Sequence, residues 1–158
     1  MKITILAVGK IKEKFFSEAV LEYKKRISRF CSLEIVEIKD EKIPENASQK
    51  ESLLVLEKEG SAILAKLPKN SFKIAMCIEG TAVSSTEFSK ILEKTKLQNS
   101  EIVFIIGGSL GLSDKVKSIS DMRISFGKIT LPHQLMRIVL SEQIYRAFKI
   151  SANEAYHK

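Results

Sequence analysis

The amino-acid sequence predicts an α/β protein with a mostly parallel sheet and helices on both faces. Short β-rich segments alternate with helical patterns along all 158 residues, the order typical of parallel strands joined by crossover helices. Capping signatures mark the starts of two helices, and glycines follow several of the strand-like segments. No repeat, low-complexity tract or long linker divides the chain, so we expect residues 1–158 to form a single domain.

Five segments have the composition expected of strands. Each is a short, largely apolar run rich in β-branched residues, bounded by polar or glycine-containing sequence. The five segments are Lys2–Val8, Leu33–Ile38, Phe72–Ile78, Glu101–Ile106 and Arg123–Phe126. Four helical stretches are predicted between them, and a fifth helix closes the chain.

Local signals place the four internal helices. The second and third begin at the capping boxes Ser48–Glu51 and Ser84–Glu87, and a short helix is expected after Ser113. The first helix has an apolar stripe at steps of three and four residues. The residues of this stripe are Phe16, Val20, Tyr23, Ile27 and Phe30.

The final helix, predicted over Pro132–Lys149, is apolar around most of its circumference. A helix of this kind must be buried on several sides. Two arrangements satisfy that requirement: a second copy of the chain covers one side, or the helix is central within one protomer. The apolar residues are Leu135, Met136, Ile138, Val139, Leu140, Ile144, Tyr145, Ala147 and Phe148.

Composition narrows the class of protein. Hydrophobic residues make up 44% and charged residues 28%, which excludes a disordered tail, a collagen-like chain and a disulfide-framework peptide. The net charge of +7 favours a polyanionic partner such as nucleic acid. The N-terminus has no signal-peptide core, and no apolar run approaches the roughly 18 residues of a membrane span. We therefore expect a cytoplasmic protein with no membrane partner, and we expect Cys77, inside an apolar strand, to be buried and inert.

Glycines cluster where three consecutive strands are expected to end, at Gly80, at Gly107–Gly111 and at Gly127. Open α/β sheets bind ligands at the carboxyl ends of their strands, where glycine lets the backbone approach a ligand closely. The alternative is ordinary turn chemistry at each corner. The sequence GGSLG is neither a dinucleotide fingerprint nor a P-loop, which argues against a standard nicotinamide site or an NTPase. The two histidines lack metal-ligand spacing, so no metal centre is predicted.

The C-terminal third combines basic, aromatic and histidine side chains. His133 stands at a predicted helix start, where the positive helix end favours a neutral imidazole; the alternative is a simple first-turn hydrogen bond. Glu142 and Arg146 are spaced for an ion pair on the helix surface. The ending Tyr156–Lys158 places an aromatic ring beside a cation, a common device for stacking an RNA base, although terminal residues are often frayed.

Four stretches together make the sequence recognisable. They are MKITILAVGK at the N-terminus, IIGGSLGL, ITLPHQLMRIVLSEQIYRAFKI and the terminal AYHK. Over its whole length the chain resembles the RlmH family of SPOUT-class RNA methyltransferases. The resemblance implies a C-terminal trefoil knot, a homodimer, and methylation of a pseudouridine in large-subunit ribosomal RNA, with an assembled ribosomal particle as the preferred substrate.

The resemblance also implies S-adenosylmethionine as methyl donor, bound at three strand-end loops without a metal. The cofactor-binding residues it assigns are Met76, Gly107, Phe126, Gly127, Lys128, Ile129, Thr130 and Leu131. Two other functions stay open: a related SPOUT enzyme that methylates transfer RNA, and a ribosome-associated RNA-binding protein without catalytic turnover.

The chemistry of the acceptor suggests the catalytic residues. Methyl transfer from a sulfonium is an in-line displacement that needs mainly alignment. The N3 of pseudouridine is a protonated imide, so a general base or a positive charge must assist. The candidates are His157, Arg146 and Tyr156, with His133 as second choice. The basic segment Lys24–Arg26 is expected to contact RNA phosphates.

Overall fold

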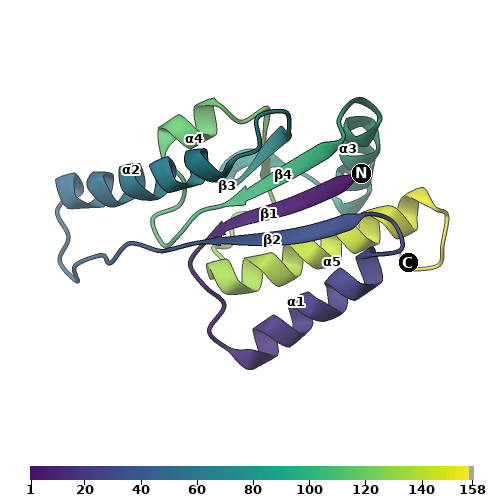
Figure 1. The fold of residues 1–158 in the computed structure, drawn as a ribbon, viewed down its shortest axis with the longest axis horizontal. Helices are drawn as coiled ribbons and strands as arrows, with labels where there is room; N and C mark the ends of the chain where they lie inside the picture. The colour runs from purple at the N-terminus through teal and green to yellow at the C-terminus, as the bar shows by residue number, and fades with distance from the viewer. Residues whose placement is uncertain (157–158) are drawn as a thin grey trace.

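The computed structural model describes residues 1–156, and within them five parallel strands form one sheet (Figure 1). The strand order is β2-β1-β4-β3-β5, and every neighbouring pair is parallel. The strands are β1 (Lys2–Val8), β2 (Ser32–Ile38), β3 (Phe72–Ala82), β4 (Glu101–Ile106) and β5 (Met122–Ser125). The α/β fold class predicted from the alternation of strand and helix is confirmed.

Helices cover both faces of the sheet. On one face lie α1 (Lys14–Ile27), α3 (Ser85–Gln98) and α5 (His133–Ser151), and on the other lie α2 (Gln49–Lys66) and α4 (Asp114–Ser118) (Figure 1). Alternate residues of each strand point to opposite faces of the sheet and contribute to two hydrophobic cores. Ile5 of β1 packs with α1, α3 and α5, and Leu6 packs with α2 and α4. No helix within residues 1–156 is both long and apolar enough to cross a membrane.

Strand β3 is longer than the sequence analysis predicted. It continues past Ile78 because its pairing with β5 shifts register between Met76 and Thr81 and then resumes. A Cβ atom at Gly80 would lie 2.7 Å from the backbone carbon of Ile124. Gly80 therefore serves the close approach of two strands, and its prediction as a strand-end corner is wrong.

Helix α5 fits into the groove between α1 and α3. The ring of Phe148 stacks on Phe30 with 5.1 Å between centroids, and Tyr145 lies 6.4 Å from Tyr23. Packing within one chain therefore explains why the sides of α5 that face α1 and the sheet are apolar. An outer strip of half-buried apolar residues remains, formed by Leu135, Ile138 and Val139. The homodimer and the trefoil knot both stay predictions.

A fully buried arginine joins α5 to the end of β1. The guanidinium of Arg137 donates to the carbonyl oxygens of Val8 and Gly9, at 2.9 and 2.6 Å, and to the carboxylate of Glu37 at 3.0 Å. The same Glu37 oxygen accepts the backbone N–H of Ile11 at 2.8 Å. Burial lowers the pKa of Arg137, with Glu37 opposing that shift. This network fixes the first half of α5 against the carboxyl edge of the sheet.

Replacing Arg137 with alanine should lower the free energy of unfolding by roughly 3–5 kcal/mol, the usual cost of breaking a buried ion pair. The substitution leaves two buried carbonyl oxygens without their donor and opens a cavity. Urea denaturation measures the loss. As a control, Arg123→Ala removes an exposed side chain and should cost about 0.5 kcal/mol or less. Equal losses in the two variants would contradict the structural role of Arg137.

Candidate functional site

A cavity of about 380 Å³ lies at the carboxyl ends of β3, β4 and β5. Its walls are residues 76–79 of β3, where the pairing with β5 shifts register, the loop 107–112 after β4, and residues 124–131 at and after the end of β5. His133 and Met136 of α5 complete the lining. Both the size and the position are typical of small-molecule sites, because open α/β sheets bind ligands at this edge.

The structure gathers most of the predicted cofactor-binding residues around this one cavity. Those that line it are Met76, Gly107, Phe126, Gly127, Ile129, Thr130 and Leu131. Lys128 is exposed on the same loop and is not part of the lining, and neither is Gly80. Three segments distant in sequence thus meet at one cavity, and two of them carry the predicted glycines Gly107 and Gly127.

The loop after β4 presents mainly backbone to the cavity. It turns tightly, since the N–H of Gly111 donates to the carbonyl oxygen of Gly108 at 3.0 Å. A Cβ atom at Gly107 would lie 2.2 Å from the carbonyl oxygen of Gly111, and Gly111 has a φ of +83°. Both positions require glycine. The cavity wall therefore offers peptide groups that can hydrogen-bond a polar ligand.

A buried glutamate packs against this loop from outside the cavity lining. The carboxylate of Glu59 on α2 would lie 2.9 Å from a Cβ atom at Gly108. One of its oxygens accepts the backbone N–H of Glu41 at 3.0 Å. Burial raises the pKa of Glu59, and the nearby charges of Asp40 and Glu41 act in the same direction. A side chain at Gly108 would have to shift the Glu59 carboxylate.

The cavity has two polar features that sequence reasoning missed. Glu79, at the register shift within β3, and Lys117 of α4 form an ion pair of 2.6 Å, and both residues contribute to the lining. No local sequence signal links them, because they come from different elements. Cys77, expected to be buried, is only half-buried and also lines the cavity. Burial raises the pKa of its thiol, so the sulfur stays protonated at neutral pH.

Of the predicted catalytic residues within residues 1–156, only His133 lines the cavity. Its imidazole packs on Gly9, where a Cβ atom would lie 2.6 Å from Nε2. Burial lowers the pKa of His133, and the positive charges of Arg137 and Lys12 lower it further. The neutral imidazole expected from the sequence therefore holds at neutral pH, with burial as the main cause.

The tail residue Tyr156 belongs to a second cluster, at the far end of α5. Arg146 forms an ion pair with Glu142 at 2.7 Å, and its guanidinium lies 4.8 Å from the centre of the Tyr156 ring. The Tyr156 hydroxyl donates to Glu142 at 3.2 Å, and the ring packs edge-on against Tyr145. Burial, followed by the charge of Glu142, raises the pKa of Tyr156 to about 12. The predicted ion pair between Glu142 and Arg146 is therefore present, and the ring of Tyr156 packs against it.

The two clusters lie far apart along α5. Arg146 follows His133 by 13 positions, which corresponds to about 20 Å along a helix axis. Figure 1 shows α5 starting near the edge where the strands end and finishing at the opposite edge. His157, also predicted to be catalytic, lies outside the described residues. Within one protomer, Arg146 and Tyr156 are thus remote from the cavity.

Comparison with known proteins decides the family. A family model described as a predicted SPOUT methyltransferase matches residues 1–157. A Clostridium perfringens protein named ribosomal RNA large subunit methyltransferase H 1 is 52% identical over 159 residues, covering all of both chains. A Clostridium botulinum protein named ribosomal RNA large subunit methyltransferase H is 53% identical over the same span.

The chain belongs to the SPOUT methyltransferase family. Within it, the chain is a member of the methyltransferase H group, as its resemblance to RlmH indicated, and it is an enzyme. A solved structure of a probable methylase family protein from Haemophilus influenzae shares the fold. Its TM-score is 0.52 at 12% identity, over 99% of this chain and 70% of that one.

The side chains around the cavity of this SPOUT methyltransferase indicate by their chemistry which ligand contacts are possible. Among residues 1–156, no three or more His, Cys, Asp or Glu side chains are arranged to hold a metal ion. The cavity instead combines backbone peptide groups, apolar side chains, one ion pair and a neutral histidine. This set of groups suits an organic ligand with both polar and apolar parts.

The lowered pKa of His133 predicts a specific pH dependence. Below its ordinary value of 6.5 the unfolded state binds the proton more readily than the folded state. The free energy of unfolding of the wild-type protein should therefore fall as the pH drops below 6.5, and His133→Gln should lose less over that range. Denaturation at pH 7.5 and 5.5 gives both slopes. Parallel pH profiles for the two proteins would show that His133 titrates normally.

Proposed function

We propose that this SPOUT methyltransferase transfers a methyl group from S-adenosylmethionine to N3 of a pseudouridine in large-subunit ribosomal RNA. The coarser activity, ribosomal RNA methylation, follows from full-length similarity to relatives that bear that name. One observation carries the finer proposal. The residues assigned to the cofactor by resemblance, with the exception of Lys128, line one cavity at the ligand-binding edge of the sheet.

The cavity fits the proposed methyl donor. Its volume suits a nucleoside-sized ligand, and its lining mixes apolar side chains such as Ile78 and Leu131 with the exposed backbone of the loop after β4. The backbone would hold polar groups of the nucleoside, and the Glu79–Lys117 pair would contribute polar contacts. When bound, S-adenosylmethionine supplies a methyl group that is already activated for displacement.

The residues of the chain differ in what they can do with the acceptor proton. Because its pKa is raised to about 12, Tyr156 is a neutral phenol at pH 7 and acts as a hydrogen-bond donor, not as a base. Arg146 remains positively charged, since its ion pair with Glu142 raises its pKa, and this charge can stabilise a deprotonated imide. His133 is neutral and can accept a proton, as can His157 in the tail by the same proposal.

The separation of the two clusters supports a homodimeric enzyme. Arg146 and Tyr156 lie about 20 Å along α5 from the cavity of their own protomer, too far to act on a ligand there. We propose that the tail of one protomer completes the cavity of its partner. The half-buried strip of Leu135, Ile138 and Val139 offers an apolar surface for such a two-fold contact.

The net charge and the names of the relatives favour ribosomal RNA over the two alternatives. A charge of +7 suits any RNA, but the relatives with more than half of their residues identical are named for the large ribosomal subunit, which disfavours transfer RNA. The glycine loops at Gly107 and Gly127, which both line the cavity, disfavour a binding protein without turnover. We propose an assembled ribosomal particle as the substrate and the cytoplasm as the place of action.

Methyl transfer to ribosomal particles tests the proposal. Radiolabelled S-adenosylmethionine should label large subunits from cells lacking this enzyme, and mass spectrometry should place the methyl group on N3 of a pseudouridine. Ile129→Arg should abolish the transfer, because it adds bulk and positive charge to the cavity wall, opposite a cationic sulfonium. Ile129 is 82% exposed, so this variant should keep wild-type stability.

The matched control is Leu97→Arg. Leu97 is 81% exposed on α3 and lies outside the cavity, so this variant should bind S-adenosylmethionine and methylate like the wild type. Calorimetry should show one cofactor bound per protomer in the control and at least tenfold weaker binding for Ile129→Arg. Equal cofactor affinity in both variants would move the site elsewhere, and a methyl group on another nucleotide would overturn the assigned acceptor.

A further inference from the structure

We propose that the segment Lys10–Phe15 is an RNA-binding surface beside the cavity, in which lysines bind backbone phosphates and Phe15 stacks on an unpaired base. We call this segment, the loop before α1 together with the first two residues of that helix, the basic–aromatic loop. The inference rests on the proposed function, since it names the part of the enzyme that holds the RNA substrate. It differs from the expectation that Lys24–Arg26 makes the phosphate contacts.

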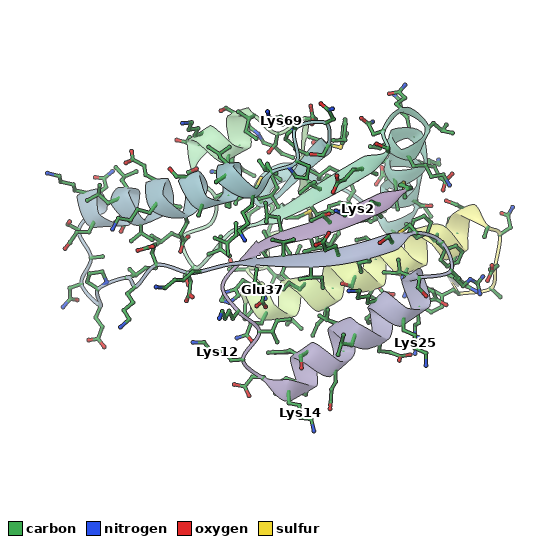
Figure 2. All side chains as sticks on the ribbon, in the orientation of Figure 1. Lys2, Lys12, Lys14, Lys25, Glu37 and Lys69 are labelled. Carbon is green, nitrogen blue, oxygen red and sulfur yellow. The ribbon has the colours of Figure 1, made fainter. Side chains whose placement is uncertain are left out.

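Hydrogen bonds hold the loop against the first turn of α5, which borders the cavity. The backbone N–H of Lys12 donates to the Gln134 side chain at 2.9 Å, and that of Ile11 donates to Glu37 at 2.8 Å. Gly9, just before the loop, packs on the imidazole of His133. Figure 2 shows Lys12 and Glu37 close together near the start of α5, with Lys14 on the same side of the molecule. RNA on this loop would lie next to the cavity.

The charge of the loop is available to a polyanion. Lys10, Lys12 and Lys14 are exposed, and within residues 1–156 no carboxylate forms an ion pair with Lys10 or Lys12. Lys14 reaches Glu18 only at 3.6 Å, between two exposed side chains, a contact that contributes little. Three lysines at alternate positions can follow successive phosphates, and each neutralised phosphate releases a counterion.

An exposed aromatic ring adds a stacking platform to these lysines. Phe15 is 60% exposed, and its ring leans on Phe16 with centroids 4.3 Å apart, which supports it from one side. Exposed aromatic rings between cations are the usual means of holding single-stranded RNA.

The other basic segment of α1 is less well placed. Lys24–Arg26 lies in the last turn of α1, and a 14-residue helix spans about 20 Å, so it is remote from the loop at the first turn. Arg26 is also engaged, since it pairs with Glu22 at 2.7 Å and lies over the rings of Tyr23 and Tyr145. In Figure 2, Lys25 lies toward the end of the molecule away from Lys12.

The lysines are tested by the salt dependence of RNA binding. The triple variant Lys10→Ala, Lys12→Ala, Lys14→Ala should bind large ribosomal subunits at least tenfold more weakly at 0.1 M salt. The slope of log affinity against log salt should fall by about 2–3, the value for three phosphate contacts. Its affinity for S-adenosylmethionine should be unchanged. The control carries alanine at Lys66, Lys69 and Lys94, three exposed lysines on other parts of the surface, and removes the same charge.

Equal losses in the two triple variants would overturn the proposal, because net charge alone would then explain binding. The proposed function fails separately, if the wild-type protein transfers no methyl group. A wild-type enzyme that methylates its substrate while the loop variant binds normally would refute only this inference.

Phe15 is tested by two single substitutions. Phe15→Ala should weaken binding by about 5- to 150-fold, the range for one lost base–aromatic stack, with little effect on the salt slope. Phe15→Tyr keeps a stacking ring and should restore binding. If Phe15→Ala instead converts a dimer to monomers in light scattering, the ring belongs to a contact between copies of the chain, and its assignment to RNA is wrong.

Discussion

Helix α5 imposes the geometry on which the rest of the enzyme depends. It is 19 residues long, about 28 Å, and it crosses the sheet from the cavity at one edge to the Tyr156 cluster at the other. Arg137, fully buried, holds its first half against the end of β1, and its last turns are held by Phe148 stacking on Phe30, just after α1, and by Tyr145 packing against Tyr23 of α1. Because α5 is held at both ends, it keeps these two clusters apart within one chain.

The cavity and the Tyr156 cluster hold their titratable groups in different charge states. At the cavity, burial keeps His133 neutral, and glycine-rich backbone leaves room for a ligand. At the tail, Arg146 is held positively charged by Glu142, and Tyr156 is held protonated. Imide methylation needs both types of environment, a ligand cradle and a polarised acceptor site. We propose that cofactor binding takes place near the first turn of α5 and acceptor chemistry near Arg146 and Tyr156.

Local patterns predicted most of the fold, because strand alternation, capping boxes and the apolar stripe of α1 are encoded within a few residues. They also predicted the loops at Gly107 and Gly127. The misplaced corner at Gly80 arises from a register shift between two strands, a property of pairing that one strand's sequence does not contain. The Glu79–Lys117 pair and the contact of Glu59 with Gly108 likewise join residues from separate elements. Such tertiary contacts leave no periodic signal.

Mixing two inactive variants tests the shared site most directly. Ile129→Arg blocks cofactor binding in the cavity of its own protomer, and Arg146→Ala removes the positive charge that its α5 would bring to the partner's cavity. Random reassociation would make half of the dimers mixed, each with one intact site, so methyl transfer to large ribosomal subunits should recover to about a quarter of the wild-type rate. A mixture that remains as inactive as its two components would contradict a site shared between protomers.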